Sequence, residues 1–170
     1  YKLGVSADGT LLLSWSTLGT DTLTESSTVA VPFANGERGS VAVMLNVVAG
    51  SNYTVKFWTK SEGGGWVQLG DTVTTAGSTS IFGSNTGLVL GGSNVFAEGD
   101  STETMAGDIY GAQVWDGIGA NTAPGQGSLV FDTSGVDFAD TSFTASSGQT
   151  VTVTGSPVLS ALYSPAGTTI

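Results

Sequence analysis

The chain contains no cysteine and no histidine among its 170 residues. The absence of cysteine excludes disulfides and thiolate metal sites. The absence of histidine removes the commonest general base, the Ser-His-Asp arrangement of hydrolases and the commonest zinc ligand. Any catalysis would therefore depend on carboxylates, hydroxyl groups or lysine amines.

Basic residues are also scarce. Lysine and arginine total 4 against 14 aspartate and glutamate residues, which gives a formal net charge of −10 at pH 7. Such a surface repels phosphate backbones and anionic lipids, so we expect no nucleic-acid partner. No apolar run approaches the ~20 residues of a transmembrane helix, so we expect no membrane insertion.

The chain starts at Tyr1, inside an apparent strand, without an initiator methionine or a visible signal peptide. We therefore expect a processed protein or a segment of a longer one. The length suits one domain, and such a chain buries roughly 70% of its unfolded surface. We expect residues 1–170 to form a single domain without stapling by disulfides.

Helix formers are sparse, whereas glycine (26 residues), threonine, serine and valine are abundant. β-Branched residues lose rotamer freedom in helices and pack well on pleated sheets. Short strands separated by turns at regular spacing are typical of a sandwich or a barrel. The sequence therefore predicts an all-β fold.

Four features of the first fifty residues can be placed on strands, turns and loops. Asp8-Gly9 lies between two apolar runs and suits a type I′ hairpin turn. Strands are expected at 28–33 and at 40–48, the second in a buried position because its sequence is nearly continuously apolar. Residues 19–27 are expected to form a long loop.

Alternation of side chains marks two further strands. In Asn52–Lys60 the residues Tyr53, Val55 and Phe57 share one face. In Asp108–Gly117 the side chains of Tyr110, Ala112 and Val114 share a face in the same way. Other strands are expected at 66–70, 79–82, 87–92 and 128–131, with a closing hairpin over 141–155 and a last strand at 157–163.

A series of motifs recurs in a recognisable order from Lys2 to about Leu159. The series resembles the laminin-G-like, concanavalin-A-like jelly-roll domains of actinobacterial phage virion proteins and related secreted proteins. The segments that carry the resemblance are VKFWTKSEGGGWVQLGDTV (Val55–Val73), GSTSIFGSNTGLVLGG (Gly77–Gly92), MAGDIYGAQVWDGI (Met105–Ile118) and DFADTSFTASSGQTVTVTG (Asp137–Gly155).

The resemblance implies a two-sheet antiparallel jelly-roll sandwich. Domains of that family carry about two more strands before the first hairpin, so the resemblance implies that these lie upstream or that another chain supplies them. They often carry tryptophan where this sequence has Val151. Because one fold hosts many functions, the implied role is an analogy.

The functional expectation follows from this resemblance. We expect a non-enzymatic bacteriophage structural protein of the tail, tail tip or capsid surface, which mediates assembly or adhesion to host-surface glycan. Its expected partners are other virion subunits, in a homo-oligomer, and host cell-wall glycan; its expected location is the virion surface or the extracellular space. The alternative is a secreted bacterial carbohydrate-binding or adhesion module.

The densest acidic cluster is EGDSTE, which contains Glu98, Asp100 and Glu103. Its spacing matches the carboxylate motif of jelly-roll glycosidases, whose two catalytic carboxyl groups must lie about 5–5.5 Å apart for retention. Here glycine, serine and threonine separate the acids, and a loop of this kind does not hold catalytic geometry. We therefore expect an exposed acidic loop. The alternative is a calcium site completed by Asp108, which would make calcium the only cofactor.

Exposed tryptophan rings stack on sugars when polar groups nearby fix the orientation. If Tyr53 and Tyr110 face inward, Trp58 and Trp115 face outward, flanked by Lys56 and Gln113. These four residues are the candidate glycan contacts. The alternative is that the outward faces pack under a loop or against a neighbouring subunit. Trp15 and Trp66 are expected in the core or against turns.

Overall fold

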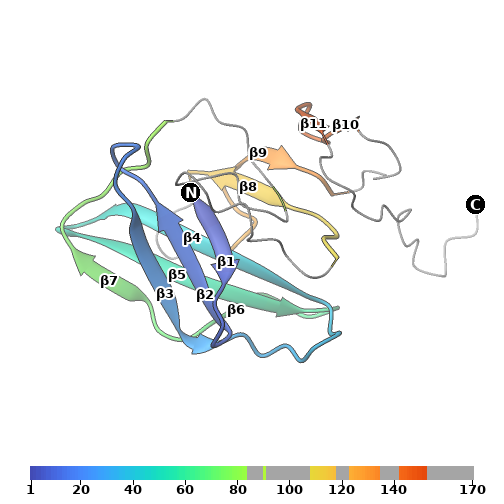
Figure 1. Cartoon of the computed structure of the whole chain (residues 1–170), viewed down its shortest axis with the longest axis horizontal. Coiled ribbons are helices and arrows are strands. Elements are labelled where there is room, and N and C mark those ends of the chain that lie inside the picture. Colours follow the sequence, from blue (N-terminus) through green and yellow to red (C-terminus); the bar gives the residue numbers. More distant parts are fainter. Residues whose placement is uncertain (84–89, 91–107, 118–122, 135–141, 153–170) are drawn as a thin grey trace, which may run out of the picture. The chain divides into compact units, whose positions relative to one another are not determined.

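The computed structural model describes residues 1–83, 90, 108–117, 123–134 and 142–152 (Figure 1). In these residues there are eleven strands, every pairing is antiparallel, no sheet closes on itself, and no helix occurs that could cross a membrane. The all-β prediction is confirmed. The chain divides into two compact units, which are Tyr1–Thr86 with Ile118–Gln126, and Gly87–Gly117 with Gly127–Ile170.

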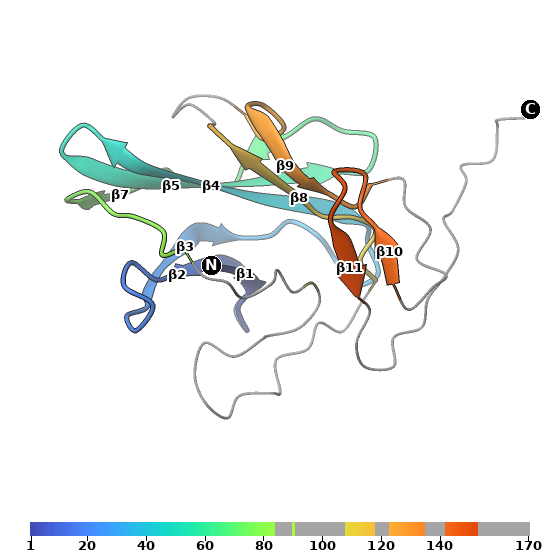
Figure 2. The same ribbon diagram turned by 90° about the horizontal axis from the view of Figure 1, so that it is seen from above.

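The first unit contains two sheets (Figures 1 and 2). The first sheet has the order β1-β2-β3, with bounds Lys2–Val5, Thr10–Trp15 and Leu23–Ala30. In the second sheet β4 pairs with one edge of β5, while β6 and β7 both pair with the other edge. The bounds of these four strands are Gly39–Ala49, Asn52–Ser61, Val67–Gln68 and Val73–Ala76.

The two sheets of the first unit pack face to face through alternate side chains of β2 and β5. The predicted inward face of β5 is confirmed, because its alternate residues are buried. Trp15 is buried as expected, and its ring meets that of Tyr53 edge-on, with centroids 5.5 Å apart. The buried members of this core are Leu11, Leu13, Trp15, Tyr53, Val55, Phe57 and Leu69.

The turn between β1 and β2 is not the expected two-residue type I′ turn. The Gly9 N–H donates to the Ser6 carbonyl at 3.0 Å, and the Ser6 N–H donates to the Thr10 carbonyl at 2.9 Å. Gly9 has a φ of 82°. These bonds define a three-residue loop that ends in a left-handed glycine. The Asp8 carboxylate accounts for the longer loop, because it accepts bonds from Ser6 Oγ and from the Thr10 N–H and hydroxyl.

The strand β3 begins at Leu23, inside the segment expected to be a loop. It pairs with β2 through a β-bulge, where Ser27 Oγ accepts the Leu11 N–H at 3.0 Å and donates to the Val29 carbonyl at 2.6 Å. The prediction failed because TLTESS lacks the apolar alternation of a strand. The strand β3 is stabilised instead by its pairing with β2 and by side-chain hydroxyl groups.

Other strand predictions also need correction. The strand β4 is present, but only Met44 is buried in it, because β4 pairs with β5 alone in the described part of the chain. Residues 79–82 are not a strand; there the chain runs past both sheets, with Thr79 N–H bonded to the Val47 carbonyl and Phe82 N–H to the Ser16 carbonyl. The strands expected at 87–92 and 157–163 lie outside the described residues, apart from Leu90.

The second unit contains two two-stranded sheets. One pairs β8 with β9, and the other pairs β10 with β11 as the expected closing hairpin. The β8 strand is shorter than expected at its N-terminal side, and Tyr110 before it is exposed rather than inward. The bounds of these strands are Gln113–Asp116, Ser128–Asp132, Ser142–Thr144 and Thr150–Thr152.

Replacement of a core side chain tests the packing of the first unit. Phe57 has no exposed surface, so Phe57→Ala should lower the free energy of unfolding by about 3–5 kcal/mol in chemical denaturation. The control is Val67→Ala, at a side chain that is 65% exposed, which should change it by no more than about 0.5 kcal/mol. Equal effects of the two changes would contradict the described core.

Candidate functional site

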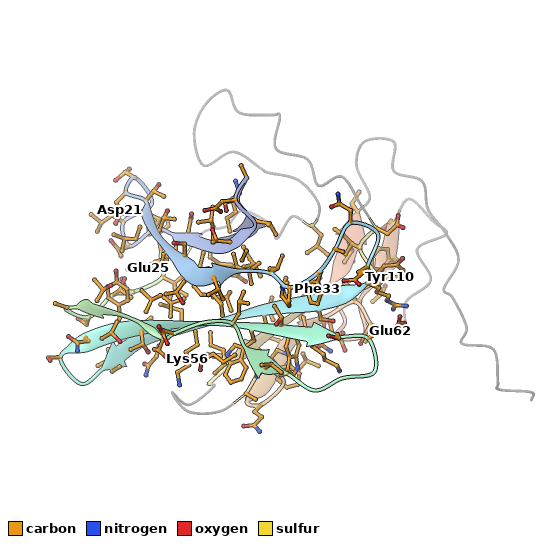
Figure 3. The ribbon with its side chains drawn as sticks, turned by 90° about the horizontal axis from the view of Figure 1, so that it is seen from below. Asp21, Glu25, Phe33, Lys56, Glu62 and Tyr110 are labelled. Carbon is orange, nitrogen blue, oxygen red and sulfur yellow. The ribbon has the colours of Figure 1, made fainter. Side chains whose placement is uncertain are left out.

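The candidate glycan residues are split between the two units. Trp58 and Lys56 lie on β5 with their side chains on the face opposite the core, as predicted (Figure 3 shows Lys56). Both are half-buried, and Trp58 Nε1 has neither solvent contact nor a hydrogen-bond partner among the described residues. Lys56 also takes part in another interaction. In the first unit the tryptophan therefore presents part of its ring but not its N–H group.

The other two candidate glycan residues lie on β8 in the second unit. Trp115 is half-buried and Gln113 is exposed. Gln113 Nε2 donates to Asp132 Oδ1 at 3.2 Å, so its amide is already oriented by a neighbouring strand. The glycan assignment of these four residues stays a prediction.

The calcium prediction falls mostly outside the described part of the chain. Glu98, Asp100 and Glu103 are not among the described residues, whereas Asp108 is exposed. Within the described ranges, no three acidic side chains converge in a way that could hold a metal ion. The calcium assignment therefore also stays a prediction.

A polar hollow at one end of the second sheet was not anticipated from the sequence. Arg38 and Glu62 form an ion pair there with an N–O distance of 3.5 Å. The Phe33 ring lies directly on Gly39, where a Cβ would be 2.4 Å from Cζ of the ring (Figure 3 shows Phe33 and Glu62). Two shallow depressions of about 190 and 450 Å³ share Arg38, Ser61 and Glu62.

This hollow contains an unusual share of the basic residues of the chain. Arg38 and Lys60 line it, and they are two of only four basic residues in the chain. Glu37 is engaged nearby, because its Oε2 accepts the Ala34 N–H at 2.8 Å. The Arg38–Glu62 pair is exposed, so solvent screens it and it contributes little to stability.

The most unusual surface of the first unit is the side formed by β1 and β4, called here the open side. Leu3 and Val5 lie directly opposite Leu13 and Leu11, so they point to the core side of the first sheet. They are nevertheless 39% and 59% exposed. Their exposure is consistent with the placement of the sheets, in which β3, at the other edge of the first sheet, contacts β5 and β7.

Exposed apolar residues also occur on β4 and just before β1. Val41 lies opposite Thr59, a buried residue on the core side of β5, and yet Val41 is exposed. Tyr1 is 51% exposed. In the described residues, β1 pairs with β2 alone and β4 pairs with β5 alone. The open side therefore has exposed apolar side chains beside strand edges that no described strand covers. Both features favour the addition of a strand from another chain.

Carboxylates in both units serve as acceptors for neighbouring hydroxyl and amide groups. Hydrogen bonds from Ser6 and Thr10 lower the pKa of Asp8 to about 2. Hydrogen bonds from Ser16, Thr17 and the Leu18 amide hold the pKa of Asp21 far below its ordinary value.

Asp132 has the same role in the second unit. The Ser134 hydroxyl donates to Asp132 Oδ1 at 2.6 Å and the Ser134 amide at 2.8 Å, which lowers the pKa of Asp132. The Asp132 backbone N–H donates to Ser147 Oγ. The adjacent Thr133 is fully buried, and its hydroxyl accepts the Ala112 N–H. These carboxylates fix loops and strand ends.

Comparisons with known proteins add no relative. No family model matches the sequence, no curated protein is significantly similar to it, and no solved structure matches it. The resemblance to phage jelly-roll domains therefore stays a prediction that depends on the quoted motifs.

The lowered carboxylate pKa values predict a particular pH dependence of stability. Asp8, Asp21 and Asp132 bind protons more weakly when folded, so their contribution is complete above the unfolded pKa near 4. It is lost as the pH falls below 4 and through the lowered folded pKa values, of which that of Asp8 is about 2. The melting temperature should therefore be flat above pH 5 and fall steeply below pH 4.

The Asp21→Asn variant should melt at a lower temperature at pH 7 and show a shallower decline below pH 4. Asp71→Asn changes the net charge equally at an exposed position, and it should leave the profile unchanged. Identical profiles for wild type and Asp21→Asn would contradict the role of the Asp21 hydrogen bonds.

Proposed function

We propose that this protein is a non-enzymatic structural module of a bacteriophage virion, carried on the tail, the tail tip or the capsid surface. It joins neighbouring subunits or attaches the particle to host cell-wall glycan. In this proposal the strands belong to a concanavalin-A-like jelly roll, whose remaining strands come from upstream sequence or from another chain.

The observation that carries the proposal is the open side of the first unit. Apolar residues that face the core side of the first sheet, such as Leu3 and Val5, remain exposed beside strand edges that no described strand covers. Proteins normally protect such edges with charges, proline or a covering segment, because an open edge recruits other chains. A module that works by assembly uses this property.

The character of the polar groups also supports a non-enzymatic role. Asp8, Asp21 and Asp132 all receive hydrogen bonds from hydroxyl and amide groups, and their lowered pKa values disfavour proton donation near neutral pH. The chain offers no histidine or cysteine to replace them. Such carboxylates stabilise loops, a property that suits a protein exposed to the environment.

Location on the particle tests the proposal most directly. Antibodies against this chain should label purified phage particles from the producing culture in immunogold electron microscopy, and mass spectrometry should find the chain in those particles. Its presence only in the cell-free supernatant or on bacterial walls would overturn the proposal and support the secreted carbohydrate-binding alternative.

A second arm of the same experiment tests adhesion. Wild-type protein should be retained by purified host cell walls, and Trp115→Ala should be retained several-fold less, because a ring that stacks on sugar contributes about 1 kcal/mol or more. Trp66→Ala is the control, since Trp66 is also half-buried but is not among the candidate contacts. Equal retention of both variants would remove Trp115 from the glycan site.

A further inference from the structure

The backbone of β1 has one edge engaged and one edge open. The Ser6 N–H donates to the Thr10 carbonyl where the hairpin closes. Hydrogen-bonded and non-hydrogen-bonded pairs alternate along an antiparallel ladder, so Gly4 also directs its backbone groups toward β2. Leu3 and Val5 direct theirs away from β2, toward an edge that pairs with no described strand.

We propose that a second copy of this chain pairs with that edge, β1 against β1, antiparallel about a twofold axis beside Gly4. Leu3 of each copy then lies opposite Val5 of the other. These are the two residues whose backbone groups point outward, so each such pair exchanges both of its N–H···O bonds. The two first sheets become one continuous sheet.

The side chains of β1 favour this register over its neighbours. The apolar residues Leu3 and Val5 are symmetric about Gly4, so the twofold arrangement brings four aliphatic side chains together on the core side of the joined sheet. A shift of the register by one residue would put the apolar side chains of the two copies on opposite faces of the joined sheet. The same surface patch serves both copies, as a twofold interface requires.

Charge complementarity supports a second copy as the occupant. Lys2 lies opposite Ser6 of the second copy in this register, and the Ser6 hydroxyl is bonded to the Asp8 carboxylate. Each lysine, which also takes part in an interaction of its own, therefore comes close to an acidic group of the other copy. β1 contains one lysine and no acidic residue, so this contact adds no carboxylates to the general repulsion between two chains of net charge −10.

The other strand on the open side fits this role less well. The outer edge of β4 is already used by this chain near its end, because the Thr79 N–H donates to the Val47 carbonyl at 3.0 Å. The side chains Val43 and Leu45 of β4 also pack against the core of the first unit. The outer edge of β1 has no comparable contact with the described residues.

The interface is small, because β1 has four residues. Interfaces below about 1,200 Å² are typical of weak association, so we expect a dissociation constant of roughly 10⁻⁴ M. The inference rests on the proposed function in one respect: many copies on a particle raise the effective concentration, so a weak pairing becomes useful there.

A cysteine cross-link tests the register. Gly4 faces Gly4 of the second copy as a non-hydrogen-bonded pair, with Cα atoms about 4.5 Å apart, a separation that a disulfide spans. A Cβ at Gly4 would have its nearest neighbour at 3.9 Å, so the position accepts a side chain. The 170-residue chain has no cysteine, so its Gly4→Cys variant has a single thiol and should form a disulfide-linked dimer under mild oxidation.

Val67→Cys is the matched control, because Val67 is 65% exposed on β6 and lies outside the proposed interface. It should remain monomeric under the same conditions. Cross-linking of Val67→Cys at the rate of Gly4→Cys would show random collision and would overturn the proposal. Failure of Gly4→Cys to cross-link faster than the control would also overturn it.

Sedimentation equilibrium measures the association without a covalent bond. The wild-type protein should dimerise as its concentration is raised, and Val5→Lys should weaken the dimer about tenfold because it removes an apolar cross-strand pair. Val67→Lys should leave it unchanged. A wild-type monomer at ten times the expected dissociation constant overturns the β1 pairing, whereas absence from phage particles overturns the proposed function; the two failures are separate observations.

Discussion

The contact between β2 and β5 is the interaction on which the first unit depends. Leu11, Leu13 and Trp15 meet Tyr53 and Phe57, and all of them are withdrawn from water. A fully buried side chain of this size contributes roughly 1.5–3 kcal/mol. In a chain without disulfides, this layer of apolar side chains is what holds two small sheets together. The strands β1, β4, β6 and β7 are added to it by backbone pairing.

Side-chain hydroxyl groups form hydrogen bonds with the polar groups that lie beside the apolar core. Ser27 accepts an amide at the bulge in β3, Thr79 accepts the Trp15 indole N–H at 2.9 Å, and Glu25 accepts the hydroxyls of Tyr53 and Thr75. Each bond satisfies a group that would be costly to bury alone. The abundance of serine and threonine is therefore explained by side-chain bonds as well as by strand preference.

Local patterns predicted the parts of the fold that local forces decide. Alternation at Tyr53 and Phe57 predicted the inward face of β5, because a strand in the middle of a half-buried sheet must separate its two faces. The start of β3 at Leu23 was missed, since its stability comes from a partner strand and not from its own sequence. The apolar run of β4 suggested burial, but its position at an edge depends on topology.

The candidate site was less predictable for the same reason. The outward direction of Trp58 followed from the period of the strand, whereas the shielding of its Nε1 atom depends on groups distant in sequence. The hollow beside Phe33 and Arg38 lies between a loop and the end of a strand. The exposure of Leu3 depends on how the two sheets lie over one another, which the local sequence does not determine. Apolar sequence indicates a surface that avoids water, but it does not identify what covers that surface.

β2 and β5 form the centre of the first unit, and in the proposed assembly the outer edge of β1 pairs with another chain. Amide hydrogen exchange, followed residue by residue, tests both halves together. We expect the slowest exchange at Leu13 and Val55, and rapid exchange at Leu3 and Val5 in dilute protein that slows as the concentration rises. Exchange at Leu13 and Val55 as fast as at exposed loops, or concentration-independent protection of Leu3 and Val5, would contradict this expectation.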